Sequence, residues 1–159
     1  MPHRILLGNL PRFNRLVLAM SPEPKGVFKD DDYDFINFRV SEIVDDMQAA
    51  IMTICEANPV SRFILTVSPV PLIATYCNRH VLVSNTYSKA CLRVAAEELS
   101  MSIPDVAYFP SYEIIAGLTT APGYYLSGLR SISPFGIEHV MRAFFLGIAS
   151  TNFSILTLG

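Results

Sequence analysis

The chain has 159 residues, of which 51% are hydrophobic and 16% are charged, with a formal net charge of -2. This length fits one domain with a core of its own, and the small net charge gives no electrostatic basis for nucleic-acid binding. The mean hydropathy of +0.37 is high, which favours association with a partner.

The N-terminal segment, residues 1–34, is not typical of a targeting sequence. Its first stretch carries arginines and no acid, but Gly8, Asn9 and Pro11 interrupt the apolar run and no cleavage site follows. We predict a strand and a loop from a larger domain in this segment. The C-terminal tail is apolar but is interrupted by polar residues and is shorter than the roughly 20 residues of a spanning helix, so we expect no transmembrane segment.

The first predicted helix begins near Ser41, a good N-cap, and ends at Asn58 and Pro59. Its apolar residues recur at steps of three and four along one face: Ile43, Val44, Met47, Ala50, Ile51 and Ile54. Residues 63–67 then form a short run of apolar strand formers, as a buried parallel strand requires. A helix followed by such a strand is half of a βαβ unit.

The loop after this strand is the first candidate for a binding site. Ser68, Pro69, Val70 and Pro71 end the strand, because neither proline can donate to a sheet ladder. Ligands of open α/β sheets bind outside the carboxyl ends of the strands, so we expect Ser68 to contact substrate. A purely structural proline turn is the alternative. Pro69 is incompatible with the elbow of a nucleophilic serine, which makes Ser68 a loop-shaping hydroxyl.

A second helix is predicted to run to Leu99 from an N-cap at Asn85 or Thr86. The predicted buried stripe consists of Cys91, Val94, Ala95 and Leu99. The side chains predicted to face water are Lys89, Arg93, Glu97 and Glu98.

A second short strand, residues 106–109, leads into a polar segment. Tyr108, Ser111, Tyr112 and Glu113 place hydroxyls and a carboxylate where this strand ends, and are candidates to bind a polar ester or a sugar. In the alternative, Ser111 and Glu113 cap a short turn while the tyrosines pack with their hydroxyls in water.

The last predicted helix begins at Pro134, with Ser133 as its N-cap. Its predicted core face consists of Ile137, Val140, Met141, Phe144 and Phe145. The alternation of helices with short apolar strands indicates an α/β fold with a parallel sheet.

Four segments of the chain carry a family resemblance: LTVSPVP from Leu65, SNTYSKACLR from Ser84, YFPSYEI from Tyr108 and GIEHVM from Gly136. Together they resemble the C-terminal half of the GSCFA family, which sits among the SGNH-type hydrolases. The resemblance implies a flavodoxin-like parallel sheet with flanking helices, here incomplete. It also implies hydrolysis or transfer of ester-linked acyl groups, with acylated carbohydrate as one expected substrate.

On this resemblance we divide the chain into a poorly matched N-terminal segment at residues 1–34, a GSCFA-like C-terminal portion at residues 35–147 and an apolar tail at residues 148–159. The family's nucleophilic serine lies in a Gly-Ser-Cys-Phe-Ala signature, which does not occur in this sequence. We therefore expect this chain to lack the nucleophile.

The base and its orienting carboxylate are also missing from their expected positions. SGNH enzymes place an aspartate and a histidine three residues apart, and the matching positions here are Gly128 and Ser131. His139, beside Glu138, is the nearest replacement for the catalytic pair, and a partly exposed structural histidine is the alternative. We expect either association with a polypeptide that carries the missing half or a non-catalytic remnant that serves as an interaction module.

The cysteines form an odd set without paired spacing: Cys55, Cys77 and Cys91. We predict reduced thiols that pack as small core residues, and a cytoplasmic location, because disulfides persist mainly in oxidising compartments. Cys77 and His80 have the spacing of two metal ligands, but zinc needs three or four and no second cluster exists. We expect no metal and no cofactor.

Overall fold

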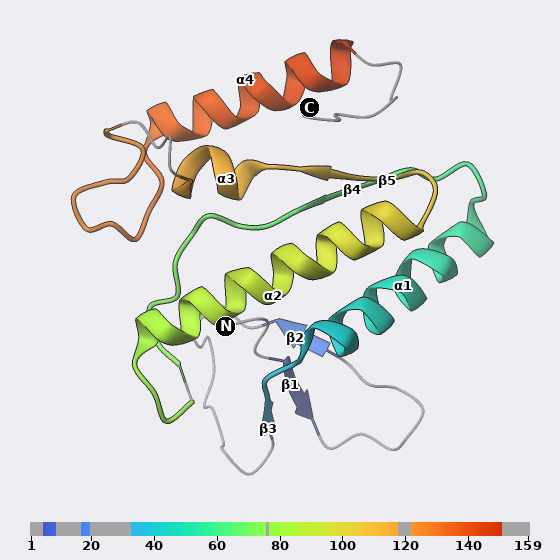
Figure 1. The fold of residues 1–159 in the computed structure, drawn as a ribbon, viewed down its shortest axis with the longest axis horizontal. Helices are drawn as coiled ribbons and strands as arrows, with labels where there is room; N and C mark the ends of the chain where they lie inside the picture. The colour runs from blue at the N-terminus through green and yellow to red at the C-terminus, as the bar shows by residue number, and fades with distance from the viewer. Residues whose placement is uncertain (1–4, 9–16, 20–32, 76, 118–121, 151–159) are drawn as a thin grey trace.

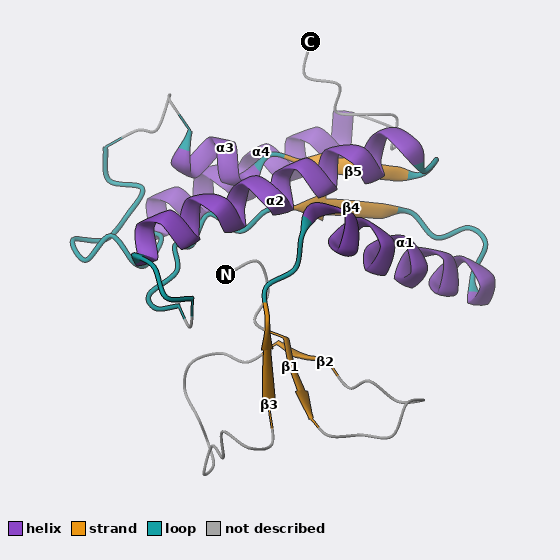
Figure 2. Ribbon diagram, turned by 60° about the horizontal axis from the view of Figure 1, so that its bottom comes forward, coloured by secondary structure: helices purple, strands orange, loops and turns teal. Residues whose placement is uncertain are grey.

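The computed structural model describes residues 5–8, 17–19, 33–75, 77–117 and 122–150 of the chain. Three short strands near the N-terminus form an antiparallel sheet, in which β1 (Ile5–Gly8) lies between β2 (Val17–Ala19) and β3 (Tyr33–Ile36). Figure 2 shows this sheet apart from the strands of the main body. The loops predicted in the N-terminal segment and the end of the apolar tail lie outside the described residues.

A β-α-β unit forms the centre of the main body. β4 (Phe63–Thr66) pairs in parallel with β5 (Val106–Phe109), and Phe63 lies opposite Val106. The helix α2 (Val81–Ser102) connects the two strands. This unit confirms the predicted α/β fold with a parallel sheet.

Helices cover both faces of the strand pair. α1 (Val40–Ala57) packs beside α2 on one face, and α4 (Pro134–Ser150) lies on the other (Figure 1). α3 (Ser111–Ala116) follows β5 at its carboxyl end and contacts α4. The ring of Phe109 in β5 makes an edge contact with the ring of Phe144 in α4, at 5.1 Å between centroids. The structure thus shows an incomplete α/β fold, a small parallel sheet flanked by helices.

α1 begins one residue before the predicted cap. The Arg39 backbone N–H donates to the Glu42 carboxylate at 2.8 Å, so Glu42 stabilises the first turn and Ser41 lies inside the helix. The predicted end is confirmed, because the Asn58 N–H closes the last turn on Ile54. The predicted apolar face is only partly buried. Ile43 and Ile51 are buried, whereas Met47, Ala50 and Ile54 are exposed.

α2 begins well before the predicted cap, and this prediction was wrong. The helix starts at Val81, where the His80 ring nitrogen Nδ1 accepts from the Leu82 N–H at 3.2 Å. Asn85 has the chemistry of an N-cap, but its side-chain oxygen accepts from the Leu72 N–H at 2.9 Å instead. The Asn85 side chain therefore bonds to the distant Leu72 and does not cap the helix as predicted.

Two positions of the α2 face were also predicted wrongly. Lys89, expected in water, is only 6% exposed, and Val94, expected in the core, is 45% exposed. Cys91 and Ala95 are buried against Ile43 of α1, as predicted for the stripe. Cys55 and Cys77 are only half buried, and all three cysteines are free thiols.

The start of α4 was predicted correctly. The Gly136 N–H donates to the Ser133 hydroxyl at 3.1 Å, the bond expected of an N-cap before Pro134. The predicted core face is partly wrong, because Ile137, Met141 and Phe145 are exposed. A small residue of α4, Gly136, lies close to its neighbours instead. A Cβ on Gly136 would lie 2.9 Å from the Tyr124 carbonyl oxygen.

Candidate functional site

The carboxyl ends of β4 and β5 lie side by side because the two strands are parallel. Two hydroxyls join these ends. The Thr66 hydroxyl donates to the Phe109 carbonyl at 2.8 Å and lies 2.6 Å from the Ser111 hydroxyl, which also contacts the Val67 carbonyl at 3.0 Å. The first turn of α3 is thereby attached to the end of β4, at the edge where open α/β sheets bind ligands.

The β4 loop, residues 68–72, continues from this edge and is bonded to α2. The Lys89 ammonium donates to the Ser68 carbonyl at 2.5 Å. In the part of the chain that the structure describes, no carboxylate lies within ion-pair distance of Lys89. Burial without an opposite charge lowers the pKa of Lys89 below its usual value.

Further bonds hold the β4 loop from other directions. The Tyr125 hydroxyl donates to the Pro69 carbonyl at 3.1 Å, and burial, with the nearby Tyr112, raises the pKa of that phenol. The Ser68 hydroxyl accepts from the Val70 N–H at 3.2 Å within the loop. The carbonyls of three consecutive residues, Val67, Ser68 and Pro69, are therefore bonded to side chains of three different segments.

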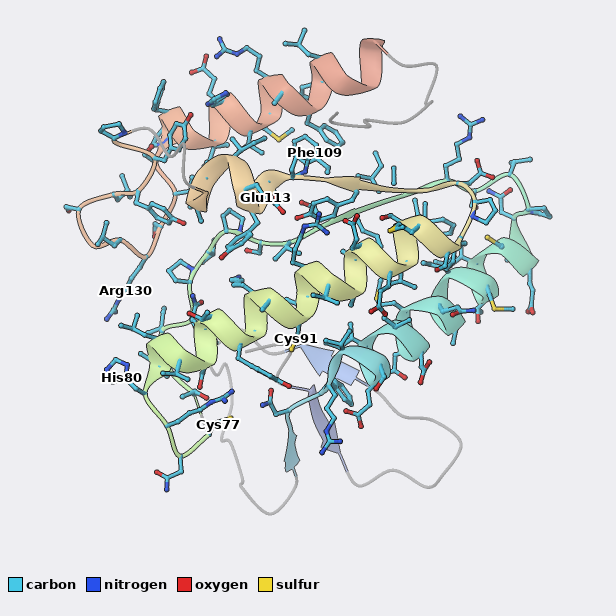
Figure 3. The ribbon with its side chains drawn as sticks, viewed as in Figure 1. Cys77, His80, Cys91, Phe109, Glu113 and Arg130 are labelled. Carbon is cyan, nitrogen blue, oxygen red and sulfur yellow. The ribbon has the colours of Figure 1, made fainter. Side chains whose placement is uncertain are left out.

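A charged cluster lies beside this edge. The Arg93 guanidinium of α2 donates to Glu113 at 2.7 Å and to Glu97 at 2.6 Å, and it lies over the Tyr108 ring at 4.1 Å. The Tyr108 hydroxyl donates to Glu113 at 2.8 Å. Figure 3 shows Glu113 on the side of α3 that faces α2. Burial and then the bond to Glu113 raise the pKa of Tyr108.

Four of the predicted substrate-binding residues lie at one edge of the sheet: Ser68, Tyr108, Ser111 and Glu113. Ser68 is exposed, and Tyr108 and Glu113 bond to each other at half-buried positions. Ser111 is 8% exposed and its hydroxyl is bonded to the ends of β4 rather than capping a turn. Ser68 is the exposed member of the four, whereas the half-buried Glu113 carboxylate already accepts from Arg93 and Tyr108.

The predicted catalytic pair lies on α4, away from these bonds. His139 Nδ1 is hydrogen-bonded to the Tyr124 hydroxyl, and Tyr124 is buried. Glu138 is exposed. Among the described residues, no serine, threonine or cysteine is hydrogen-bonded to a histidine. Gly128 and Ser131, the positions matched to the acid and base, are exposed in the loop before α4.

A family model matches most of this chain, over residues 11–144, and that model is the GSCFA family. The chain belongs to the GSCFA family. A comparison with curated proteins finds no match, and a comparison with solved structures finds none either.

Three residues that hold the β4 loop in this GSCFA chain were not predicted: Lys89, Asn85 and Tyr125. Lys89 and Asn85 are four residues apart, so they share a helix face. A lysine and an asparagine on one face are typical of a solvated face, so no sequence pattern indicated that Lys89 is buried. Tyr125 follows a segment without a clear period, and its contact crosses 56 positions of sequence, so no local pattern predicts it.

Other kinds of site are not seen in the described part of the GSCFA chain. Those residues contain no group of three His, Cys, Asp or Glu side chains placed to hold a metal ion. Within the same residues, no helix has the length and apolarity needed to cross a bilayer.

Proposed function

We propose that this GSCFA domain binds ester-linked acyl groups, such as those on acylated carbohydrate, at the carboxyl ends of β4 and β5. The main support for this proposal is the hydrogen bonding of the β4 loop. Hydrogen bonds from Ser111, Lys89 and Tyr125 fix the carbonyls of Val67, directly before the loop, and of Ser68 and Pro69 within it. Pre-organised backbone is what an ester site requires. Ser68 and Glu113 add polar atoms beside the loop, where they can bond to hydroxyls of the substrate.

Turnover of the ester is not part of this proposal for the isolated chain. A serine attacks an ester only when a base removes its proton, and His139 is bonded to the Tyr124 phenol. Hydrolysis or transfer therefore requires a nucleophile on a partner polypeptide. The free thiols of Cys55, Cys77 and Cys91 favour a cytoplasmic setting for this assembly.

Two measurements on the purified chain test the proposal. Ligand-observed NMR with glyceryl triacetate is expected to show binding that Glu113→Ala weakens. Hydrolysis of p-nitrophenyl acetate is expected to stay at the rate of buffer alone, and His139→Ala is expected to change nothing. Absence of binding contradicts the acyl-ester site, whereas turnover that disappears in His139→Ala would make the chain an enzyme in its own right.

A second candidate function is that of an interaction module, and the outer faces of α1 and α4 favour it. Met47 and Ile54 on α1, and Ile137, Met141 and Phe145 on α4, are large apolar side chains exposed on both sides of the sheet. Such surfaces mark protein contacts. Sedimentation of the chain with and without Ile137→Lys and Phe145→Lys tests this function, because loss of self-association or partner binding in the variant supports it and identical sedimentation opposes it.

A further inference from the structure

Lys89 is placed where a lysine is costly. It lies in the middle of α2 and is 6% exposed, and the carbonyl of Ser68 is its acceptor among the described residues. An ammonium that is removed from water without a carboxylate loses hydration that one hydrogen bond does not replace. An apolar side chain of similar length would fill the same space without this loss, so packing alone does not explain the lysine.

The acceptor of Lys89 explains its position. Ser68 is the first residue of the β4 loop, and the prolines at positions 69 and 71 have no backbone N–H to bond the loop to the sheet. The shape of the loop therefore depends on bonds from side chains. Lys89 supplies the charge-assisted bond of the set, and such bonds are the stronger kind.

The direction of this bond has a consequence for the ligand side of the loop. A carbonyl that accepts from the interior fixes the orientation of its peptide plane. The plane of the Ser68 carbonyl continues into Pro69, which has no N–H but whose ring fixes φ, so it limits where the next peptide, with the Val70 N–H, can lie. The bond from Tyr125 to the Pro69 carbonyl sets the rotation of that next peptide. The Val70 N–H contacts the exposed Ser68 hydroxyl at a long 3.2 Å, so both groups remain at the surface of the loop.

We propose that Lys89 is a positioning residue of the acyl-ester site, which sets the backbone of residues 68–70 for ligand contact through its bond to the Ser68 carbonyl. The inference rests on the proposed function for the identity of the ligand. It goes beyond that function in assigning the shape of the site to one buried cation.

The test compares the full chain with Lys89→Met, which keeps the length of the side chain and removes its charge. Arg130→Met is the matched control, because it removes the same charge from an exposed loop position. Three properties are measured for each protein: the melting temperature, the amide exchange of Val70 with Phe109 of β5 as the reference, and the affinity for glyceryl triacetate by NMR titration.

For Lys89→Met we expect a melting temperature equal to that of the wild type or higher, faster exchange at Val70, unchanged exchange at Phe109 and about tenfold weaker triacetate binding. Arg130→Met should match the wild type in all three. Equal exchange at Val70 in wild type and Lys89→Met overturns the inference, and so does a loss of affinity that follows a general loss of stability. If the wild type does not bind triacetate, the proposed function fails, whereas the exchange at Val70 still decides whether Lys89 positions the loop.

Discussion

The hydroxyl of Ser111 lies 2.6 Å from the hydroxyl of Thr66 and joins the start of α3 to the end of β4. These two side chains come from segments 45 positions apart, and the Ser111 hydroxyl also contacts the Val67 carbonyl. The hydroxyls of Thr66 and Ser111 therefore bond to the carbonyls of Phe109 and Val67 at the edge where we propose ligand binding. The bond belongs to the framework of the site.

Ser111→Ala is expected to lower the free energy of unfolding by about 1–3 kcal/mol, because it leaves the carbonyl of the buried Val67 without its donor. Urea denaturation measures this change. Ser127→Ala, at an exposed loop position, is the control and should lie within about 0.5 kcal/mol of wild type. Equal stability of the two variants would show that water replaces the Ser111 hydroxyl without cost.

Tyr108 is expected to remain protonated well above the range of an ordinary tyrosine. Burial raises its pKa first, and the bond to the Glu113 carboxylate raises it further. Titration of the phenolate absorbance measures the pKa of Tyr108, and comparison with Tyr108→Phe assigns its signal. Glu113→Gln removes the negative charge and should lower the pKa of Tyr108 while leaving it above that of free tyrosine. A Tyr108 signal that titrates with the pKa of free tyrosine is incompatible with the structure.

The sequence was informative where a local rule decides the structure. The apolar run at Phe63 and the cap at Ser133 predicted β4 and the start of α4, because strand burial and capping depend on neighbouring residues. The start of α2 was predicted wrongly because Asn85 bonds to Leu72 across the fold. Lys89 was assigned to water because charge predicts exposure on average, and only a tertiary acceptor overrides that average.

The positions of the site residues show the same contrast between local rules and tertiary contacts. The order of strand and loop placed Ser68 and Glu113 at one edge of the sheet in advance, because parallel strands end on the same side. The apolar periodicity of α4 did not predict the exposure of Ile137 and Phe145. Periodicity shows that a helix has an apolar face, but it carries no information on which other element covers that face.

Lys89 should make the stability of the domain depend on pH in a defined direction. Because burial lowers its pKa in the folded chain below the value of 10.5, the unfolded chain binds a proton more readily than the folded chain between these two pKa values. The free energy of unfolding should therefore rise with pH across that window and lose this contribution as the pH falls through the folded pKa.

Urea denaturation of wild type and Lys89→Met between pH 7 and the window's upper end, on the order of pH 10.5, isolates this effect. The difference between the two proteins should move in favour of the wild type as the pH rises, because the variant lacks the titrating group. A difference that is constant with pH would mean that the folded protein does not disfavour the charged lysine.

Gly136 is expected to resist substitution although it lies in the first turn of a helix, where alanine is normally preferred. A Cβ at this position would lie 2.8 Å from the Ile132 side chain and 2.9 Å from the Tyr124 carbonyl oxygen, and the backbone oxygen cannot move without disturbing the loop before α4. Gly136→Ala should lower the free energy of unfolding by about 1–3 kcal/mol. Gly128→Ala is the matched control, since nothing lies within 4 Å of its Cβ position, and it should be neutral or up to about 1 kcal/mol stabilising. Thermal and urea denaturation of both variants measure the contrast, and a Gly136→Ala variant as stable as Gly128→Ala would show that α4 does not pack this closely against the Tyr124 loop.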